Sequence, residues 1–178
     1  MDTAPNVVLT LVSNSDQTEL CEAYWREYGD WAVAEYAARY GVIAEPDHDG
    51  IHRELPTMLG DRGRLYLAEL DGVVVATAAL KPIDAESAEV KRMYVRPSAR
   101  GRGLSRLLLE RLLADAAEIG YSRLRLDTLD FMIEAQALYR SVGFVDGTPY
   151  ELSETMRAGV SDHTVYMELS LTGYEDQR

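Results

Sequence analysis

The sequence is most constrained around a glycine-rich turn at residues 100–105 (Arg-Gly-Arg-Gly-Leu-Ser), which joins a predicted strand to a predicted helix. Residues 88–95 are rich in β-branched and aromatic side chains, which is typical of a strand. In Leu104–Ile119, apolar residues recur every three or four positions between charged ones, and Gly120 follows. This pattern predicts an amphipathic helix with a glycine stop.

A strand–glycine–helix junction of this kind favours the binding of an anion. Glycines let backbone N–H groups turn inward without an intervening side chain. The first turn of the helix adds unpaired N–H donors and the positive end of the helix dipole. Arg100, Arg102 and Arg106 bring positive charge to a chain whose net charge is -12. The turn is therefore a candidate site for a phosphate or pyrophosphate.

Two common phosphate-binding motifs do not fit the turn. A Walker loop requires four residues between its glycines and a Gly-Lys-Ser/Thr ending, whereas Gly103 is followed by Leu104 and Ser105. A dinucleotide fingerprint requires a third glycine where Arg106 stands. The remaining pattern is Arg-x-x-Gly-x-Ser, from Arg100 to Ser105. It resembles the Arg/Gln-x-x-Gly-x-Gly/Ala signature of the GCN5-related N-acetyltransferases (GNAT), with serine replacing the usual small residue.

Four features in the same order carry this resemblance, and they lie within residues 64–146. They are the strand with Glu89, the glycine turn, the strand at 123–128 (Arg-Leu-Arg-Leu-Asp-Thr) and the segment 137–144 (Ala-Leu-Tyr-Arg-Ser-Val-Gly-Phe). The resemblance implies an α/β fold with a mixed, mostly antiparallel sheet, a parallel β-α-β crossover and helices on both faces. We expect one N-acetyltransferase domain over residues 1–178.

The resemblance also implies acetyl-CoA as the acetyl donor and the amine of a small molecule or peptide as the acceptor. Amides of the turn would hold the pyrophosphate, and main-chain groups of a splayed strand would bond the pantetheine arm. The implied cofactor-binding residues are Met93, Tyr94, Val95, Arg100, Gly101, Arg102, Gly103, Leu104, Ser105 and Arg106. Met132, just after Asp130, stands near the place where many family members carry an asparagine that touches the cofactor.

Glu89 is the candidate general base, acting directly or through a water molecule. Many members of the resembled family carry a catalytic glutamate at this place on the central strand. A partly buried carboxylate has a raised pKa, which makes it a better proton acceptor near neutral pH. The alternative is a structural ion pair with Lys91 or Arg92, or an exposed charge at a sheet edge.

Tyr139 is the candidate general acid for the departing thiolate, because a tyrosine at this helix position in the family often points at the cofactor sulfur. A phenol with a pKa of about 10 is protonated at neutral pH and can donate. The alternative is a core tyrosine beside Leu138 and Phe144. Direct acetyl transfer needs no covalent nucleophile, and we interpret Cys21 as a packing residue.

Other functional classes remain open or are excluded by composition. The alternatives are a non-catalytic acyl-CoA sensor, an O-acetyltransferase or longer-chain acyltransferase, and a protein-interaction module without a cofactor. The acidic net charge argues against a nucleic-acid surface. A single cysteine excludes an internal disulfide and a multi-cysteine zinc site.

Short stretches of the sequence give the expectations for the cellular compartment and for metal binding. No apolar run is long enough to span a membrane, and residues 1–5 lack the pattern of a signal peptide, so we expect a cytoplasmic protein. His48 and His52 are four apart, but Pro46 and Gly50 disfavour a helix that would align them, so we expect solvated loop histidines and no metal. The family resemblance also makes a homodimer possible, because members of the family are often homodimers.

The remaining elements are predicted from periodicity and turn residues. Residues 7–12 form a strand, and Ser15 or Asp16 caps a helix. That helix is interrupted at Gly29-Asp30, and a second one at 31–40 ends at Gly41. The aromatic residues of these helices are expected mainly to pack, with one or two facing the acceptor.

The segment 45–63 is expected to be a polar loop, and strands at Arg64–Leu70 and 73–80 form a hairpin at Asp71-Gly72. Three consecutive strands with short links predict an antiparallel meander ahead of the crossover. A helix at 131–142, an irregular segment at 148–161 and a last strand at 163–171 complete the chain.

Overall fold

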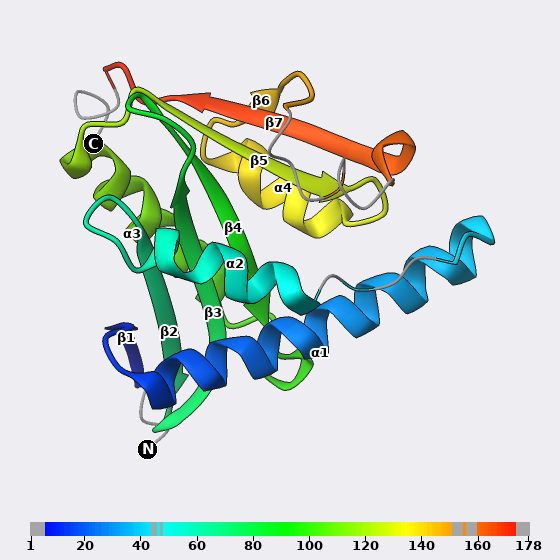
Figure 1. The fold of residues 1–178 in the computed structure, drawn as a ribbon, viewed down its shortest axis with the longest axis horizontal. Coiled ribbons are helices and arrows are strands. Elements are labelled where there is room, and N and C mark those ends of the chain that lie inside the picture. The colour runs from blue at the N-terminus through cyan, green and yellow to red at the C-terminus, as the bar shows by residue number, and fades with distance from the viewer. Residues whose placement is uncertain (1–5, 44–45, 47, 151–154, 156–159, 174–178) are drawn as a thin grey trace.

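The structure is a computed structural model that describes residues 6–43, 46, 48–150, 155 and 160–173. Its described part is built on a seven-stranded sheet in the order β1-β2-β3-β4-β5-β7-β6 (Figure 1). The strands are β1 (Val7–Leu11), β2 (Arg64–Leu70), β3 (Val73–Pro82), β4 (Ser87–Val95), β5 (Arg123–Leu129), β6 (Val145–Asp146) and β7 (Thr164–Ser170). The helices are α1 (Ser15–Tyr40), α2 (His48–Met58), α3 (Leu104–Ile119) and α4 (Ile133–Ser141).

The strand pairing confirms the predicted fold class. β1 to β4 are antiparallel neighbours, β4 and β5 are parallel, and β7 is antiparallel to both β5 and β6. Helix α3 makes the crossover from β4 to β5, as the alternation of strand and helix predicts. The β2–β3 hairpin turns at Asp71 and Gly72, whose φ angles of 53° and 82° suit a two-residue turn.

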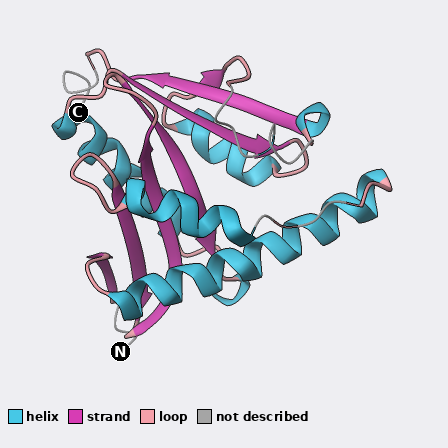
Figure 2. Cartoon of the chain, in the orientation of Figure 1, coloured by secondary structure: helices cyan, strands magenta, loops and turns pink. Residues whose placement is uncertain are grey.

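Helices cover both faces of the sheet (Figure 2). The leucines of α3 share one core with Tyr139 of α4 and with Leu80 and Val90 of the sheet. On the opposite face, Cys21 and Trp25 of α1 and Met58 of α2 form a second core with β2 and β3. Because strand side chains alternate, the neighbours of Leu80 and Val90, namely Lys81 and Glu89, lie on the α2 side. Two side-chain layers thus meet the sheet, and the one on the α1–α2 side includes buried charges beside its apolar core.

Helix α1 runs without a break, so the predicted interruption at Gly29-Asp30 is wrong. A glycine inside a helix costs only about 1 kcal/mol relative to alanine. Burial on both sides of the glycine outweighs that cost, since Trp25 is 2% exposed and Tyr36 is 4% exposed. Although α1 has 26 residues, no helix in the described part of the chain has both the length and the hydropathy to cross a membrane.

The ends of α1 are set by one predicted residue and one that was missed. The N-cap is Asn14, whose side chain accepts a hydrogen bond of 3.0 Å from the Gln17 N–H, rather than Ser15 or Asp16. Asparagine is as good an N-cap as serine or aspartate, so composition alone does not separate these neighbours. Gly41 ends the helix in the left-handed conformation, as predicted.

Helix α2 replaces much of the loop predicted at 45–63, and this prediction is wrong. Pro46 lies ahead of the helix, and Pro56 lies in its last turn. The inward residues of α2 include the charged Glu54 beside the apolar Met58, exposed by 6% and 0%. The prediction of a loop rested on Pro46 and Gly50, but Pro46 lies ahead of the helix and Gly50 lies in its first turn, where both are tolerated.

The connection from α2 to β2 has one position that requires glycine for reasons of space. A Cβ built on Gly63 would lie 2.3 Å from the Thr57 carbonyl oxygen and 2.5 Å from that of Met58. A Cβ on Gly60 would meet only ordinary contacts, the nearest at 3.5 Å. Gly63 thus lets β2 start close against the end of α2.

We predict that Gly63→Ala lowers the free energy of unfolding by about 1–3 kcal/mol, because backbone atoms would have to move apart. Gly60→Ala is the matched control and should change it by no more than about 0.5 kcal/mol. Urea unfolding followed by circular dichroism measures both values. Equal effects of the two substitutions would contradict the tight packing of α2 against β2.

Candidate active site

The parallel pair β4–β5 opens part-way along its length. Among the described residues the two strands are paired at 87–89 and 123–125, and the pairing ends at Glu89 and Arg125 (Figure 1). Beyond this point the backbone of β4 on the β5 side makes no ladder with β5. This divergence is the splay implied by the family resemblance.

A β-bulge lies in β4 within the splayed stretch. Thr77 of β3 pairs with Tyr94, and Ala79 pairs with Lys91, so one residue of β3 lies opposite two of β4. Arg92 takes up the irregularity with a φ of 55°. A bulge bends a strand and increases its twist, which turns the end of β4 away from β5.

The glycine turn ends in an uncapped helix N-terminus. Gly101 and Gly103 have φ angles of 76° and 78°, and a Cβ on either would meet nothing within 4 Å. Glycine is therefore required here for its conformation rather than for space. Gly103 is the N-cap of α3, and no side chain among the described residues caps that end. The first amides of α3 are thereby left for an anion.

The three arginines predicted at the turn have different surroundings. The Arg100 Nε donates to the Val95 carbonyl oxygen at 3.2 Å, and its guanidinium lies 5.7 Å from the centre of the Trp31 ring. Arg106 donates to the Ser141 Oγ at 2.8 Å and so links α3 to α4. Arg102 is exposed. Arg100 therefore braces the turn, while Arg102 extends into solvent.

The other predicted cofactor-binding residues lie where the splay meets the turn. Met93, Tyr94 and Val95 form the end of β4, beyond the last residue paired with β5. Leu104 is 2% exposed and anchors the start of α3 in the core, and Ser105 follows it half-buried. The structure thus brings the predicted residues of β4 and of the turn into one continuous stretch.

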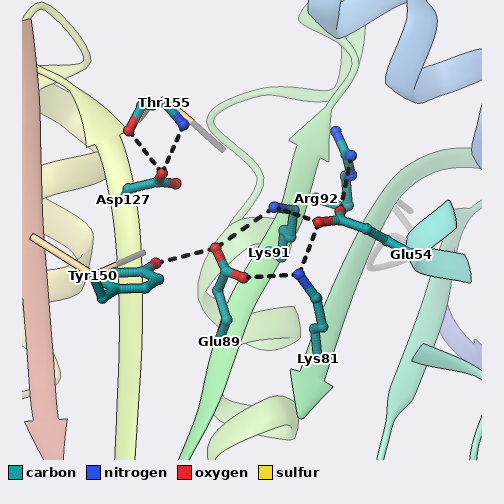
Figure 3. A network of polar contacts seen from close by, with 8 residues as sticks. All are labelled: Glu54, Lys81, Glu89, Lys91, Arg92, Asp127, Tyr150 and Thr155. Carbon is teal, nitrogen blue, oxygen red and sulfur yellow. Dashed lines mark hydrogen bonds and ion pairs between the residues drawn. The ribbon is translucent and has the colours of Figure 1, made fainter. Parts of the chain in front are cut away.

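Glu89 is fully buried on the α2 side of the sheet, at the last paired position of β4. Its Oε1 accepts a hydrogen bond of 3.1 Å from the Tyr150 hydroxyl (Figure 3). The Nζ of Lys91 lies 3.6 Å from Oε1, and the Nζ of Lys81 lies 3.6 Å from Oε2. Burial raises the pKa of Glu89, although the two lysines oppose it. A raised pKa suits a carboxylate that takes up a proton near neutral pH.

Glu54 is the residue that sequence reasoning missed. Its Oε1 lies 2.8 Å from the Lys81 Nζ and 3.3 Å from the Lys91 Nζ, and its Oε2 lies 3.1 Å from the Arg92 Nη2 (Figure 3). Burial alone would raise the pKa of Glu54, but the surrounding cations lower it to about 2. Arg92, one of the two alternative partners considered for Glu89, pairs with Glu54.

Tyr139 approaches the splay from the opposite face. It lies in α4, its ring packs on Phe144 with centroids 5.8 Å apart, and its hydroxyl lies 3.8 Å from the Met93 Sδ. Burial raises the pKa of the phenol above its usual value, so the group stays protonated. Tyr139 is thus a core residue whose hydroxyl donates a hydrogen bond to Met93, in the splayed part of β4.

A second carboxylate, Asp127 of β5, lies on the same face as Glu89 (Figure 3). Its Oδ2 accepts hydrogen bonds from the backbone N–H and the Oγ1 of Thr155, at 3.1 and 2.8 Å. The segment 148–161, predicted to be irregular, lies mostly outside the described residues. Asp127 raises the pKa of Glu89 further, because two nearby carboxylates disfavour each other's ionisation.

Helix α1 joins the two diverging halves of the sheet with aromatic side chains. Tyr28 packs on Tyr94 of β4 with ring centroids 5.6 Å apart, and Trp31 packs on Phe131, just after β5, at 6.4 Å. Most aromatic residues of α1 therefore pack, as expected. The aromatic bridge places α1 across the open ends of β4 and β5.

The last turns of α1 contact residues that come after β5 in the chain. Tyr40 stacks on the His163 ring with centroids 3.5 Å apart, and its hydroxyl donates to Asp130. His163 Nδ1 lies 3.1 Å from the other Asp130 oxygen. Met132 stands near the place where many family members carry an asparagine. Its Sδ accepts a hydrogen bond of 3.5 Å from the Tyr28 hydroxyl. Met132 thus contacts α1.

Two further predictions concern cysteine and metal. Cys21 is fully buried, and burial raises its thiol pKa to about 12, which agrees with a packing role. His52 lies in a helix and not in the predicted loop, and its Nδ1 is 3.0 Å from Glu22. Within the described ranges, no three His, Cys, Asp or Glu side chains are grouped as metal ligands.

Comparison with known proteins gives one family throughout. The sequence model of the Acetyltransferase (GNAT) family matches residues 18–144. The Uncharacterized N-acetyltransferase YjgM of Escherichia coli (strain K12) is 31% identical over 140 residues, which cover 76% of this chain and 78% of that protein.

Solved structures share the fold. An acetyltransferase from Streptococcus agalactiae superposes with a TM-score of 0.70 at 19% identity, over 93% of this chain and 98% of the other. A GNAT family acetyltransferase from Elizabethkingia anophelis, solved with acetyl-CoA bound, has a TM-score of 0.63 at 17% identity, over 93% and 99%.

We predict that Tyr150→Phe raises the pKa of Glu89 by about one unit, because the lost hydrogen bond stabilises the charged carboxylate. Tyr166→Phe is the matched control, since the Tyr166 ring packs against Tyr150 while its buried hydroxyl makes no hydrogen bond within the described part. Carbon-13 NMR of the labelled Glu89 carboxyl measures both. A pKa unchanged by Tyr150→Phe would mean that the hydroxyl does not support the carboxylate.

Proposed function

Because the chain belongs to the acetyltransferase (GNAT) family, we propose that it is an acetyl-CoA-dependent N-acetyltransferase acting on the amine of a small molecule or peptide. The observation that carries this proposal is the junction of two features, namely the β4–β5 splay that begins after Glu89 and the uncapped start of α3. Together they offer main-chain hydrogen-bonding groups along one continuous path.

The residues present suit acetyl-CoA. Amides at Gly103 and in the first turn of α3 would hold the pyrophosphate, since they combine unpaired donors with the positive helix end. Arg102 lies exposed beside them and adds positive charge. The unpaired edge of β4 at Met93 to Val95 would bond the amides of the pantetheine arm, in the manner of an added strand. When bound, acetyl-CoA supplies a thioester whose carbonyl carbon accepts an amine.

Glu89 and Tyr139 supply the two proton transfers that the reaction requires. Glu89 accepts the proton of the attacking amine, for which its raised pKa is suited. Tyr139 donates its hydroxyl proton to the thiolate that leaves, and its position next to Met93 directs it to the splay. The base approaches from the α1–α2 face and the acid from the α3–α4 face, so acceptor and donor would enter from opposite sides of the sheet.

The acidic net charge of -12 favours a cationic acceptor over an anionic one. An ammonium ion is attracted to a negatively charged protein before it loses its proton. Aromatic side chains of α1, Tyr28 and Trp31, lie across the open end and would contact the part of the acceptor next to its amine.

We predict that Glu89→Gln and Tyr139→Phe each lower kcat by about 100-fold or more, because each removes one proton transfer. The measurement is thiol release from acetyl-CoA with a panel of amines. Thermal stabilisation by CoA should be retained in both variants, because neither substitution touches the pyrophosphate site. Wild-type turnover in both variants would contradict the assigned roles, and wild-type protein with CoA binding but no turnover of any amine would indicate a sensor.

We predict that Gly103→Ala weakens CoA binding by about 10-fold, because a side chain in the left-handed conformation costs about 1–2 kcal/mol and the first amides of α3 would turn away. Gly120→Ala is the matched control. It carries the same positive φ at the other end of α3, again with nothing within 4 Å of the added Cβ. Calorimetric titration with CoA should show a loss in the first variant only, and equal affinities would place the pyrophosphate elsewhere.

A further inference from the structure

The buried charged side chains beneath α2 include more cations than carboxylates. Two carboxylates, Glu54 and Glu89, share three cations, Lys81, Lys91 and Arg92, and every one of these charged side chains is at most 9% exposed. Charges this far from water persist only if they are paired with one another. The way the cations divide between the two carboxylates therefore sets the environment of Glu89.

The distances show that Glu54 takes the larger share. The Lys81 ammonium lies 2.8 Å from Glu54 but 3.6 Å from Glu89, and the Lys91 ammonium lies 3.3 Å from Glu54 but 3.6 Å from Glu89. A separation of 3.6 Å is beyond hydrogen-bonding distance. The Oε2 of Glu89 accordingly accepts no hydrogen bond from the described residues. Both lysines attract Glu89 by charge. The Lys81 ammonium donates a hydrogen bond to Glu54, and the Lys91 ammonium lies nearer to Glu54 than to Glu89.

We propose that Glu54 is a positioning residue for acetyl transfer: it holds the ammonium groups of Lys81 and Lys91 outside hydrogen-bonding distance of Glu89, so that Glu89 can take up a proton. This inference rests on the proposed role of Glu89 as the general base. A charge-assisted hydrogen bond from either lysine would stabilise the carboxylate and make it a weaker base. Glu54 is well suited to compete, because Arg92 holds its second oxygen in place.

The other groups around Glu89 do not replace Glu54 in this role. Tyr150 donates one hydrogen bond to Oε1, and the Arg125 guanidinium lies 5.5 Å from the centre of the Tyr150 ring. Asp127 of β5 acts on Glu89 through its charge and accepts hydrogen bonds from Thr155. Of the two carboxylates that both lysines contact, Glu54 of α2 is the nearer one.

The test compares Glu54→Gln with wild-type protein in two measurements. Carbon-13 NMR of the ligand-free protein gives the pKa of the Glu89 carboxyl, and kcat/KM for acetyl transfer as a function of pH gives its acid limb. With the carboxylate of Glu54 replaced by an amide, the lysines should turn to Glu89, and both quantities should fall by about one pH unit. The fall includes the loss of the Glu54 charge, which itself raises the pKa of Glu89. A role of Glu54 in packing alone would lower the rate without moving either quantity.

A second variant gives the opposite sign and guards against misfolding of the first. Lys81→Gln removes a cation beside Glu89, so the NMR pKa and the acid limb should both move to higher pH. Asp49→Asn is the matched control, because it removes one negative charge from an exposed position of the same helix and should move neither quantity. If Glu54→Gln does not fold, the NMR pKa and the acid limb measured in Lys81→Gln decide the test.

The outcomes separate this inference from the proposed function. An NMR pKa of Glu89 that stays constant in Glu54→Gln and Lys81→Gln overturns the positioning role. An NMR pKa that shifts while the acid limb does not would show that Glu89 is not the base, which overturns the catalytic part of the inference. If no amine is acetylated, the proposed function fails, and the NMR titration alone still shows whether Glu54 controls Glu89.

Discussion

The divergence of two parallel strands is the constraint on which the rest of this molecule depends. β4 and β5 pair through Glu89 and then separate, helped by the bulge at Arg92. Strands that separate leave main-chain groups unpaired, which is costly inside a protein unless another molecule bonds them. The separation therefore creates both the need for a ligand and the edge on which it can lie.

Two devices hold the separated strands in place. Helix α1 spans the opening with Tyr28, which packs on Tyr94 of β4, and with Trp31, which packs on Phe131 just after β5. Beneath α2, the buried charges around Glu54 fix the α2 side of β3 and β4. Such a charge cluster stabilises little by itself, since desolvation offsets most of its attraction. The contribution that we propose for it is positional, because the Lys81 ammonium donates its hydrogen bond to Glu54 and not to Glu89.

The strands and the turn could be predicted from the sequence because their determinants are local. Asp71-Gly72 marks a hairpin, and Gly101 and Gly103 mark a left-handed turn, since few other residues adopt those conformations. Helix α2 and the continuity of α1 could not be predicted in this way. Both depend on burial against distant elements, and a local breaker such as Gly29 is outweighed when residues on either side are packed.

The candidate site shows the same division between local and distant determinants. Glu89 and Tyr139 were found through segments whose pattern resembles the family, and the splay was expected on the same ground. Glu54 was not found, because its partners Lys81 and Lys91 lie in strands far along the chain. The sequence pattern of α2 does not distinguish a buried carboxylate from an exposed one, and only the folded arrangement shows that Glu54 faces three cations.

Hydrogen–deuterium exchange with and without CoA tests most directly whether the open edge of β4 and the start of α3 form one binding surface. Amides that gain hydrogen bonds or lose solvent exchange more slowly. We predict that CoA slows exchange at residues 93–95 and 101–106 together, while the hairpin turn at 71–72 is unaffected. Protection confined to other segments, or no protection on saturation with CoA, would contradict the central role of the splayed strands.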